Sequence, residues 1–367
     1  MKYIFILGNN PELSQAEIEA VLPQLKIVKN SSQYLVAETP KFDCQEMMAR
    51  LGGTVKIGIF LGDKPEVGPI LGSAGSQTGQ GRFNFGLSFY GQKPSSWGMK
   101  IKKTLKEQGI GCRLVTSREP ALSSVIVTKE KCHDFLIGPD FFGLTCAVQD
   151  FEEYSNRDFG RPKSDALSGM LPPKLAKMMI NLAQVSEDKI ILDPFCGSGT
   201  ILSEALALGY HNLIGSDLST KAVNDSQENC EWLIKNFQLK NYSLKFFNLD
   251  ARKLSLKIKE QTMDAIVTEP YLGPPIKGNE SPERIKKNLA ELEVLYLETF
   301  QELKKILRSK GKLVIVIPEW HLGAKIFQLN IFDGIAKLGY ERKDKNNLFY
   351  RREDQKVWRQ IIVLEKK

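Results

Sequence analysis

The residues best suited to chemistry lie in the octapeptide Asp193-Pro194-Phe195-Cys196-Gly197-Ser198-Gly199-Thr200. Its two glycines allow a tight turn and a close approach of the backbone to a ligand. A short apolar run, 190–192, precedes the octapeptide, and good helix formers follow it. The pattern predicts a buried strand, a glycine turn and a helix, the arrangement that binds nucleotide-like ligands in open α/β sheets.

The class of ligand follows from what surrounds this turn. A dinucleotide fingerprint needs a third glycine where Leu202 stands, and no Gly-Lys-Ser/Thr of a phosphate-binding loop follows. Instead, acids close three successive predicted strands, at Asp193, Asp217 and Asp250. The second acid can accept hydrogen bonds from both ribose hydroxyls, and the third can meet an adenine amine. Together they suit an adenosine that carries a cationic sulfonium and no phosphates.

The octapeptide, with acids at the following strand ends, resembles the S-adenosylmethionine motif of class I amino-methyltransferases that act on nucleic acid bases. The resemblance implies a cofactor site formed by Asp193, Phe195, Cys196, Gly197, Gly199, Thr200, Asp217, Leu218, Asp250 and Ala251. We expect the thiol in this set to be a buried wall of the site rather than a nucleophile.

Composition agrees with a soluble nucleic-acid enzyme without requiring one. The formal net charge of +8 and a pI near 9.0 permit nucleic-acid binding, and 42% hydrophobic residues are ordinary for a globular chain. No apolar run is long enough to span a membrane, and residues 1–7 are too short for a signal peptide. We therefore expect a cytoplasmic protein. The six cysteines and three histidines show no metal-ligand or paired spacing, so we expect neither a metal nor a disulfide.

The first 150 residues are predicted to form two modules. Residues 1–67 read as a ferredoxin-like α+β module with strands at 3–8, 33–38 and 55–61 and helices at 14–22 and 44–51. A Gly/Ser/Gln-rich segment, 68–81, reads as a loop or linker. Strands are then expected at 82–90, 112–115, 124–128, 135–137 and 144–149, with a basic helix at 99–108. This order resembles a THUMP domain, which implies an RNA-binding domain over 68–150, with Lys100 and Lys103 as candidate RNA contacts.

The connector, 151–172, strengthens the resemblance. The stretches 150–163 and 168–176 look like the tRNA guanine-N2 methyltransferases that carry a THUMP domain and methylate guanosine at tRNA position 10. Arg157, Arg161 and Lys163 lie in this connector at the mouth of the next domain, where cations can meet RNA phosphates. A structural linker that is salt-bridged through Asp158 and Asp165 is the alternative.

A second chemical motif ends the fourth predicted core strand. The apolar run 263–268 is followed by Glu269, Pro270 and Tyr271. Hydrogen-bond acceptors here, the Glu269 carboxylate and the Pro270 carbonyl, would localise the lone pair of an exocyclic amine toward the methyl donor, so that catalysis rests on orientation. The family pattern has Asp or Asn, two prolines and an aromatic. Tyr271 is therefore either a stacking platform or the replacement for the second proline.

The remaining elements complete an α/β fold. A long helix is expected at 281–308, a buried strand at 312–317, and an antiparallel pair at 347–351 and 358–364. We therefore expect residues 173–367 to form a class I Rossmann-like methyltransferase sheet with an antiparallel last strand, preceded by an α+β N-terminal module and a THUMP-like domain.

The leading hypothesis is an S-adenosylmethionine-dependent methyltransferase that modifies a guanine N2 of tRNA, at or near position 10. The alternatives are methylation of another RNA amine, such as a guanine of ribosomal RNA or an adenine N6, a non-catalytic RNA-binding relative, and a small-molecule or protein methyltransferase. The sequence leaves open the number of methyl groups added, the tRNA set, the oligomeric state and the need for an activating partner subunit.

Overall fold

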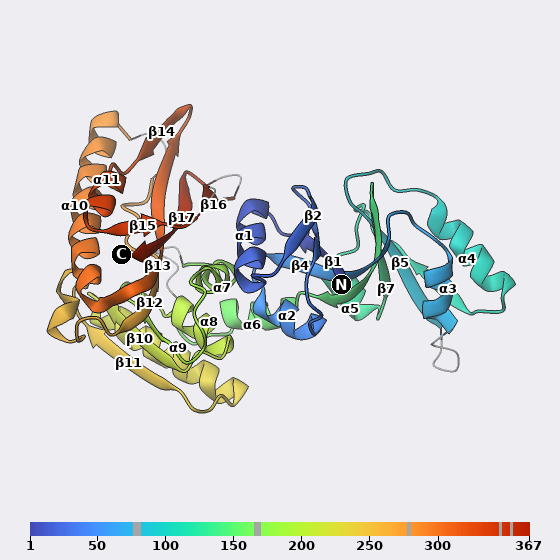
Figure 1. Ribbon diagram of the computed structural model, residues 1–367, viewed down its shortest axis with the longest axis horizontal. Coiled ribbons are helices and arrows are strands. Elements are labelled where there is room, and N and C mark those ends of the chain that lie inside the picture. Colours follow the sequence, from blue (N-terminus) through green and yellow to red (C-terminus); the bar gives the residue numbers. More distant parts are fainter. Residues whose placement is uncertain (76–81, 165–169, 277–279, 345–346, 353–354) are drawn as a thin grey trace. The chain divides into compact units, whose positions relative to one another are not determined.

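The computed structural model describes residues 1–75, 82–164, 170–276, 280–344, 347–352 and 355–367 (Figure 1). The chain divides into two compact units, residues 1–15 with 22–152, and residues 16–21 with 153–367. We treat each unit by itself. The predicted domain boundaries at 67/68, 150/151 and 172/173 stay predictions.

The first unit is built on one continuous sheet. The strand order is β2 (Lys26–Asn30), β3 (Tyr34–Glu38), β1 (Lys2–Leu7), β4 (Thr54–Gly62), β8 (Phe141–Val148), β7 (His133–Gly138), β5 (Phe83–Phe89) and β6 (Cys112–Val115). Helices α1 (Pro11–Val21), α2 (Cys44–Arg50), α3 (Gly68–Gly75), α4 (Trp97–Glu107) and α5 (Ser124–Lys129) connect these strands. The strands of the two predicted N-terminal modules therefore share one hydrogen-bonded sheet.

Two local predictions in this unit are wrong. Residues 124–128 were expected to form a strand because they are rich in β-branched side chains. They form helix α5, which the Ser123 side chain caps by accepting from the Ile126 N–H. Residues 68–75, expected as loop, form helix α3, which buries Ile70 and Ala74; residues 76–81 of the same predicted loop lie outside the described residues.

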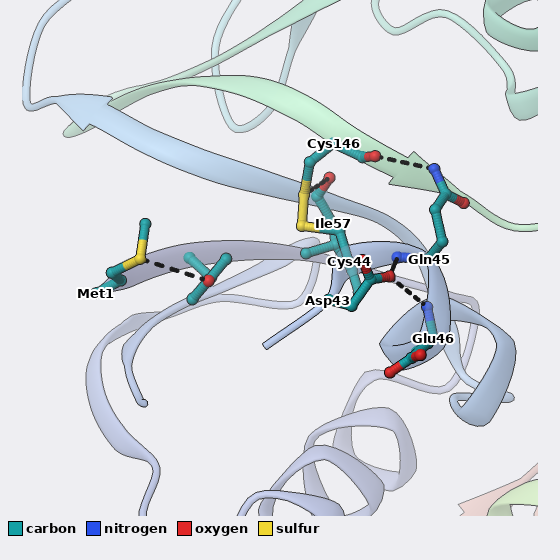
Figure 2. The surroundings of a disulfide bond; sticks show 8 residues. Met1, Asp43, Cys44, Gln45, Glu46, Ile57 and Cys146 are labelled. Atoms are coloured by element: carbon teal, nitrogen blue, oxygen red, sulfur yellow. Dashed lines mark hydrogen bonds between the residues drawn. A yellow bond between two sulfur atoms is a disulfide. The ribbon is translucent and has the colours of Figure 1, made fainter. Parts of the chain in front are cut away.

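The expectation that the chain has no disulfide is also wrong. Cys44, the first residue of α2, is bonded to Cys146 of β8 across 102 residues of sequence. Figure 2 shows this bond beside Gln45, whose side-chain amide donates to the Cys146 carbonyl at 3.1 Å. Helix α2 packs against β8, which brings the two cysteines together, and no spacing rule could reveal this. The other four cysteines are free and buried.

The second unit is the predicted methyltransferase sheet. Its main strand order is β11 (Ser243–Asn248), β10 (Asn212–Asp217), β9 (Ile190–Asp193), β12 (Met263–Thr268), β13 (Leu307–Leu322), β17 (Val357–Lys366) and β15 (Tyr340–Arg342). The first five run parallel, and β17 pairs antiparallel to β13, as expected. Strand β14 (Lys325–Gln328) pairs with β13, and β16 (Leu348–Tyr350) pairs antiparallel with β17.

Helices complete this unit (Figure 1). They are α6 (Phe151–Phe159), α7 (Pro173–Leu182), α8 (Thr200–Ala207), α9 (Thr220–Phe237), the 3-10 turn η1 (Ala251–Leu256), α10 (Pro282–Ile306) and α11 (Phe332–Lys337). The largest apolar core joins α10 to strands β12, β13 and β17 through fully buried side chains such as Phe300, Ile266 and Ile315. Because the parallel strands all end at one edge, the loops after β9, β10 and β12 lie at that edge.

Candidate active site

The glycine turn follows β9, a central strand whose Ile191 and Leu192 are fully buried between β10 and β12. Gly197 and Gly199 take left-handed backbone angles, with φ of +49° and +83°. A Cβ on Gly199 would lie 2.4 Å from the Ser226 hydroxyl, so only glycine fits there, whereas a Cβ on Gly197 would meet open space. The turn therefore packs tightly behind the second glycine and leaves its backbone open at the first.

Asp193 closes β9 and is buried at 1% exposure. Its Oδ1 accepts from the Thr268 hydroxyl at 2.7 Å and from the Phe195 N–H at 3.2 Å. Burial raises the pKa of Asp193 to about 7, although both hydrogen bonds favour its charged form, and the nearby charges of Asp217 and Glu269 raise it further. Acids with a pKa raised in this way are typical of functional sites, and a cation bound beside Asp193 would favour its ionised form.

Asp217 ends β10 and reaches the same turn. Its Oδ2 accepts from the Gly197 N–H at 3.0 Å, and its Oδ1 accepts from the Ser219 N–H at 2.9 Å. Each carboxylate oxygen has a second lone pair, so the group can still accept from two hydroxyls. The next residue, Leu218, is 72% exposed although it is apolar.

Asp250 follows β11 but is already paired. The Arg252 guanidinium donates to both of its oxygens, with a shortest distance of 2.7 Å, and the Arg252 N–H donates to Oδ1. Hydrogen bonding to Arg252 lowers the pKa of Asp250, so it is a firmly ionised acid. The predicted contact between Asp250 and an adenine amine stays a prediction, and Ala251 beside it is buried.

The other predicted cofactor residues line the turn. Phe195 is partly buried, and Cys196 and Thr200 are buried. Burial raises the pKa of the Cys196 thiol, so this thiol is neutral, in line with its expected role as a wall. Thr200, the first residue of α8, accepts a hydrogen bond from Arg161 at 2.7 Å.

The loop after β12 carries Glu269, Pro270 and Tyr271. The Tyr271 side chain is 56% exposed, while Pro270 is buried. Two buried side chains from elsewhere in the sheet unit fix the loop backbone. The Tyr296 hydroxyl of α10 donates to the Tyr271 carbonyl at 3.2 Å, and the Trp320 indole of β13 donates to the Leu272 carbonyl at 3.2 Å.

Gly273 shows how closely that loop packs. Its φ is +95°, and a Cβ on it would lie 2.4 Å from the Trp320 ring. The loop backbone is thus closely packed at Gly273, while the Tyr271 ring is exposed.

The Glu269 side chain is bonded to a residue on β17, which lies two strands away from β12 in the sheet. The Arg359 Nε on β17 donates to Glu269 Oε1 at 2.5 Å, and the two side chains are only 9% and 13% exposed. Burial raises the pKa of Glu269, and the charge and hydrogen bond of Arg359 act in the opposite direction. The sequence offered no signal for Arg359, Tyr296 or Trp320, since their sequence distances from their loop partners are 90, 25 and 48 residues.

The connector arginines do not present their charges to solvent. Arg157 is 4% exposed, and its Nε donates to Glu204 Oε1 of α8 at 2.7 Å, while Nη1 pairs with Glu153. Arg161 is 8% exposed and bonds Thr200. Both cations thus bond side chains of helix α8, and Arg161 also lies 3.8 Å from Asp158, one of the two acids of the structural alternative. Asp165, the other acid, lies outside the described residues, and contact of either arginine with RNA stays a prediction.

The predicted lysine contacts are more open. Lys163 is 40% exposed, with Nζ 3.2 Å from Glu228. In the first unit, Lys100 is exposed on α4, and Lys103 is 80% exposed with Nζ 3.8 Å from Glu107. Helix α4 buries Gly98, Ile101 and Leu105 on the opposite face. Contact of these lysines with RNA stays a prediction.

The donor set fits S-adenosylmethionine. Asp217 supplies a hydroxyl acceptor, the open backbone at Gly197 admits a ligand, and Asp193 supplies buried negative charge for a cationic group. Within the described ranges, no cluster of His, Cys, Asp and Glu suits a metal ion. None of the helices in these ranges is long and apolar enough to cross a membrane.

Comparison with known proteins places this site among methyltransferases. Residues 161–337 match the family described as the RMKL-like methyltransferase domain. A tRNA (guanine(10)-N2)-dimethyltransferase of Methanothermobacter thermautotrophicus is 26% identical over 337 residues, which cover 86% of this chain and 88% of the relative. A probable tRNA (guanine(10)-N2)-dimethyltransferase of Methanothermococcus thermolithotrophicus is 34% identical over 122 residues, covering 32% of this chain and 72% of the relative.

A solved structure extends the likeness to the fold of the entire chain. The crystal structure of TrmN from Thermus thermophilus aligns with a TM-score of 0.54 at 17% identity and covers 100% of both chains. At this identity the likeness concerns the fold alone. It agrees with the predicted Rossmann-like sheet.

Proposed function

The chain belongs to the family of S-adenosylmethionine-dependent tRNA guanine-N2 methyltransferases, and we propose that it methylates the exocyclic N2 of the guanine at tRNA position 10. The methyl donor is S-adenosyl-L-methionine. The relatives named for guanine-10 dimethylation support both the base and its position.

The residues that would hold the cofactor come from the loops after β9 and β10. Asp217 would accept from the ribose hydroxyls, and Gly197 and Gly199 would let the turn approach the ligand closely. Asp193 would balance the positive charge. When bound, the cofactor supplies an electrophilic methyl group on a sulfonium.

The residues of the β12 loop would orient the base. The Glu269 carboxylate accepts a hydrogen bond from the guanine amine, as does the Pro270 carbonyl, and both bonds localise the nitrogen lone pair. Tyr271, held through its own carbonyl by Tyr296, stacks its exposed ring on the base. After transfer, the nitrogen carries one additional carbon and releases one proton to solvent.

One observation carries the proposal. Thr268, the residue directly before Glu269, donates its hydroxyl to Asp193 at 2.7 Å. The candidate amine acceptor is therefore one residue away from a group that contacts the cofactor motif. This closeness supports direct transfer from cofactor to base.

The RNA contacts belong to the same proposal. Lys100 and Lys103 on α4 and Lys163 in the connector present exposed charge. We assign them to RNA phosphates, with residues 68–150 acting as a THUMP-like RNA-binding domain within a larger N-terminal region. A tRNA substrate supports a cytoplasmic location.

The test uses two tRNA transcripts and labelled S-adenosylmethionine. One transcript carries guanosine at position 10, and the other carries inosine, which lacks only the 2-amino group. We expect N2-methylated guanosine at position 10 of the first transcript and no label in the second. Label on the inosine transcript, or on another nucleoside, would contradict the assigned atom.

A further inference from the structure

Glu269 is bonded to a cation from a distant strand. Arg359 lies on β17, where it pairs in register with Pro318 of β13. Strand β13 separates β17 from β12, so the Arg359 side chain crosses β13 to reach the residue after the end of β12. This crossing connects the antiparallel last strand with the catalytic loop.

The bond to Arg359 occupies one carboxylate oxygen of Glu269 and leaves the other available to a ligand. Arg359 Nε donates to Oε1 at 2.5 Å. Among the described residues, Glu269 Oε2 has no hydrogen-bond partner. An ionised carboxylate accepts hydrogen bonds at both oxygens, whereas a protonated one is itself a donor at one of them. Because Arg359 occupies Oε1, a proton taken up by the carboxyl group would lie on Oε2 and make that oxygen a donor, so Oε2 is the stronger amine acceptor while the group is charged.

The surroundings of Glu269 work against that charge. The side chain is 13% exposed, Asp193 of β9 adds negative charge once it is ionised, and Tyr296 of α10 is a buried neutral phenol. Among the described residues, the charge and hydrogen bond of Arg359 on β17 oppose these effects. A guanidinium stays protonated throughout the physiological range, so its effect on Glu269 does not change with pH.

We infer that Arg359 is a positioning residue of the methyl transfer: it holds Glu269 ionised and leaves Oε2 free for the guanine amine. The inference rests on the proposed role of Glu269. It also gives a physical account of the Glu in place of the usual Asp or Asn, because the longer side chain can bond a strand two positions away in the sheet while remaining at the loop.

The experiment compares Arg359→Met with Arg359→Lys in single-turnover methylation of the guanosine-10 transcript, from about pH 5 to about pH 9. Removing the cation should shift the acidic limb of the rate–pH profile of Arg359→Met toward higher pH by about one unit or more. The rate should fall about 10-fold at the acidic end, and this loss should shrink as pH rises. The Lys variant should restore most of the original profile.

Lys312→Met is the matched control. Lys312 pairs with Glu365 across the same two strands, β13 and β17, but does not contact the catalytic loop. Its removal should leave the pH profile unmoved. A loss in Arg359→Met that is equal at every pH would mean a structural role only and would overturn the inference.

A second readout needs no variant of Arg359. Carboxyl ¹³C NMR of the unmodified protein, with the Glu269 signal assigned by its absence in Glu269→Gln, reports its protonation directly. We expect a carboxylate that stays charged at and above neutral pH; a midpoint above pH 7 would contradict the inference. Full activity of Glu269→Gln would refute the proposed function itself, whereas an inactive Glu269→Gln with an unshifted Arg359→Met profile would refute only this inference.

Discussion

The two loops of the active-site edge are held in different ways. The glycine turn after β9 is fixed partly by bonds within it, from Phe195 to Asp193 and from Gly199 to Cys196. Neighbouring strands supply the rest: Asp217 of β10 accepts from Gly197, and Thr268 of β12 donates to Asp193. The loop after β12 is fixed by Tyr296, Trp320 and Arg359, each on a different later element. Bonds within the turn therefore hold part of the first loop, whereas these three bonds to the second loop all come from later elements of the completed sheet.

The largest effect should come from removing the carboxylate that bonds the glycine turn. Asp217→Ala removes the acceptor for Gly197 and for the ribose hydroxyls, so we expect cofactor affinity to fall about 100-fold. Isothermal titration calorimetry with S-adenosylhomocysteine measures this. Asp188→Ala, which changes an acid just before β9 whose side chain is 69% exposed, is the control. An affinity of Asp217→Ala within about twofold of the original would refute the site assignment.

Two connector cations, Arg161 and Lys163, should affect cofactor binding and tRNA binding separately. Arg161→Met removes the buried donor to Thr200 at the start of α8, so cofactor affinity should fall about 10-fold while tRNA binding is kept. Lys163→Met should leave cofactor affinity unchanged, weaken tRNA binding a few fold, and reduce its salt slope by about 1. Calorimetry and filter binding at several salt concentrations separate the two. Weaker tRNA binding with unchanged cofactor affinity in Arg161→Met would instead show that Arg161 contacts RNA.

The buried acid of the glycine turn predicts a pH dependence. Because the pKa of Asp193 is raised from 3.8 to about 7, the folded state holds its proton more tightly than the unfolded chain. Its stabilising effect is complete below pH 3.8 and is lost as pH rises through about 7, so Asp193→Asn should flatten the dependence of melting temperature on pH over that range.

The same titration should couple to the cofactor. Positive charge near Asp193 favours its ionised form, so binding of S-adenosylmethionine should release a proton near neutral pH and strengthen as pH rises through about 7. Calorimetry in two buffers of different ionisation enthalpy measures the proton count. Identical heats in both buffers would show that Asp193 does not sense the cofactor.

The smallest effect should come from one bond of the second loop. Tyr296→Phe removes the donor to the Tyr271 carbonyl, worth about 1 kcal/mol, and should lower the transfer rate about fivefold without changing cofactor affinity. Tyr340→Phe removes a comparable bond, to the Phe300 carbonyl at 3.1 Å, away from the loop. An equal rate loss in both variants would point to general destabilisation instead.

These contrasts explain what the sequence could reveal. The strand, turn and helix around Gly197 follow from local patterns, and so does the parallel sheet with its antiparallel last strand. Helix α5 was missed because its cap and packing outweigh the strand preference of Val125, Ile126 and Val127. The Cys44 disulfide and the burial of Arg157 depend on partners 102 and 47 residues away, which become visible only in the folded chain.

The central claim is that Glu269 acts on the base and the glycine turn acts on the cofactor. Single-turnover methylation of the guanosine-10 transcript by Glu269→Gln, with cofactor affinity measured on the same preparation, tests it most directly. We predict an unchanged cofactor affinity and a transfer rate reduced about 100-fold, because an amide oxygen is a weaker acceptor than a carboxylate. A rate near that of the unmodified chain, or a loss explained by weaker cofactor binding, would contradict it.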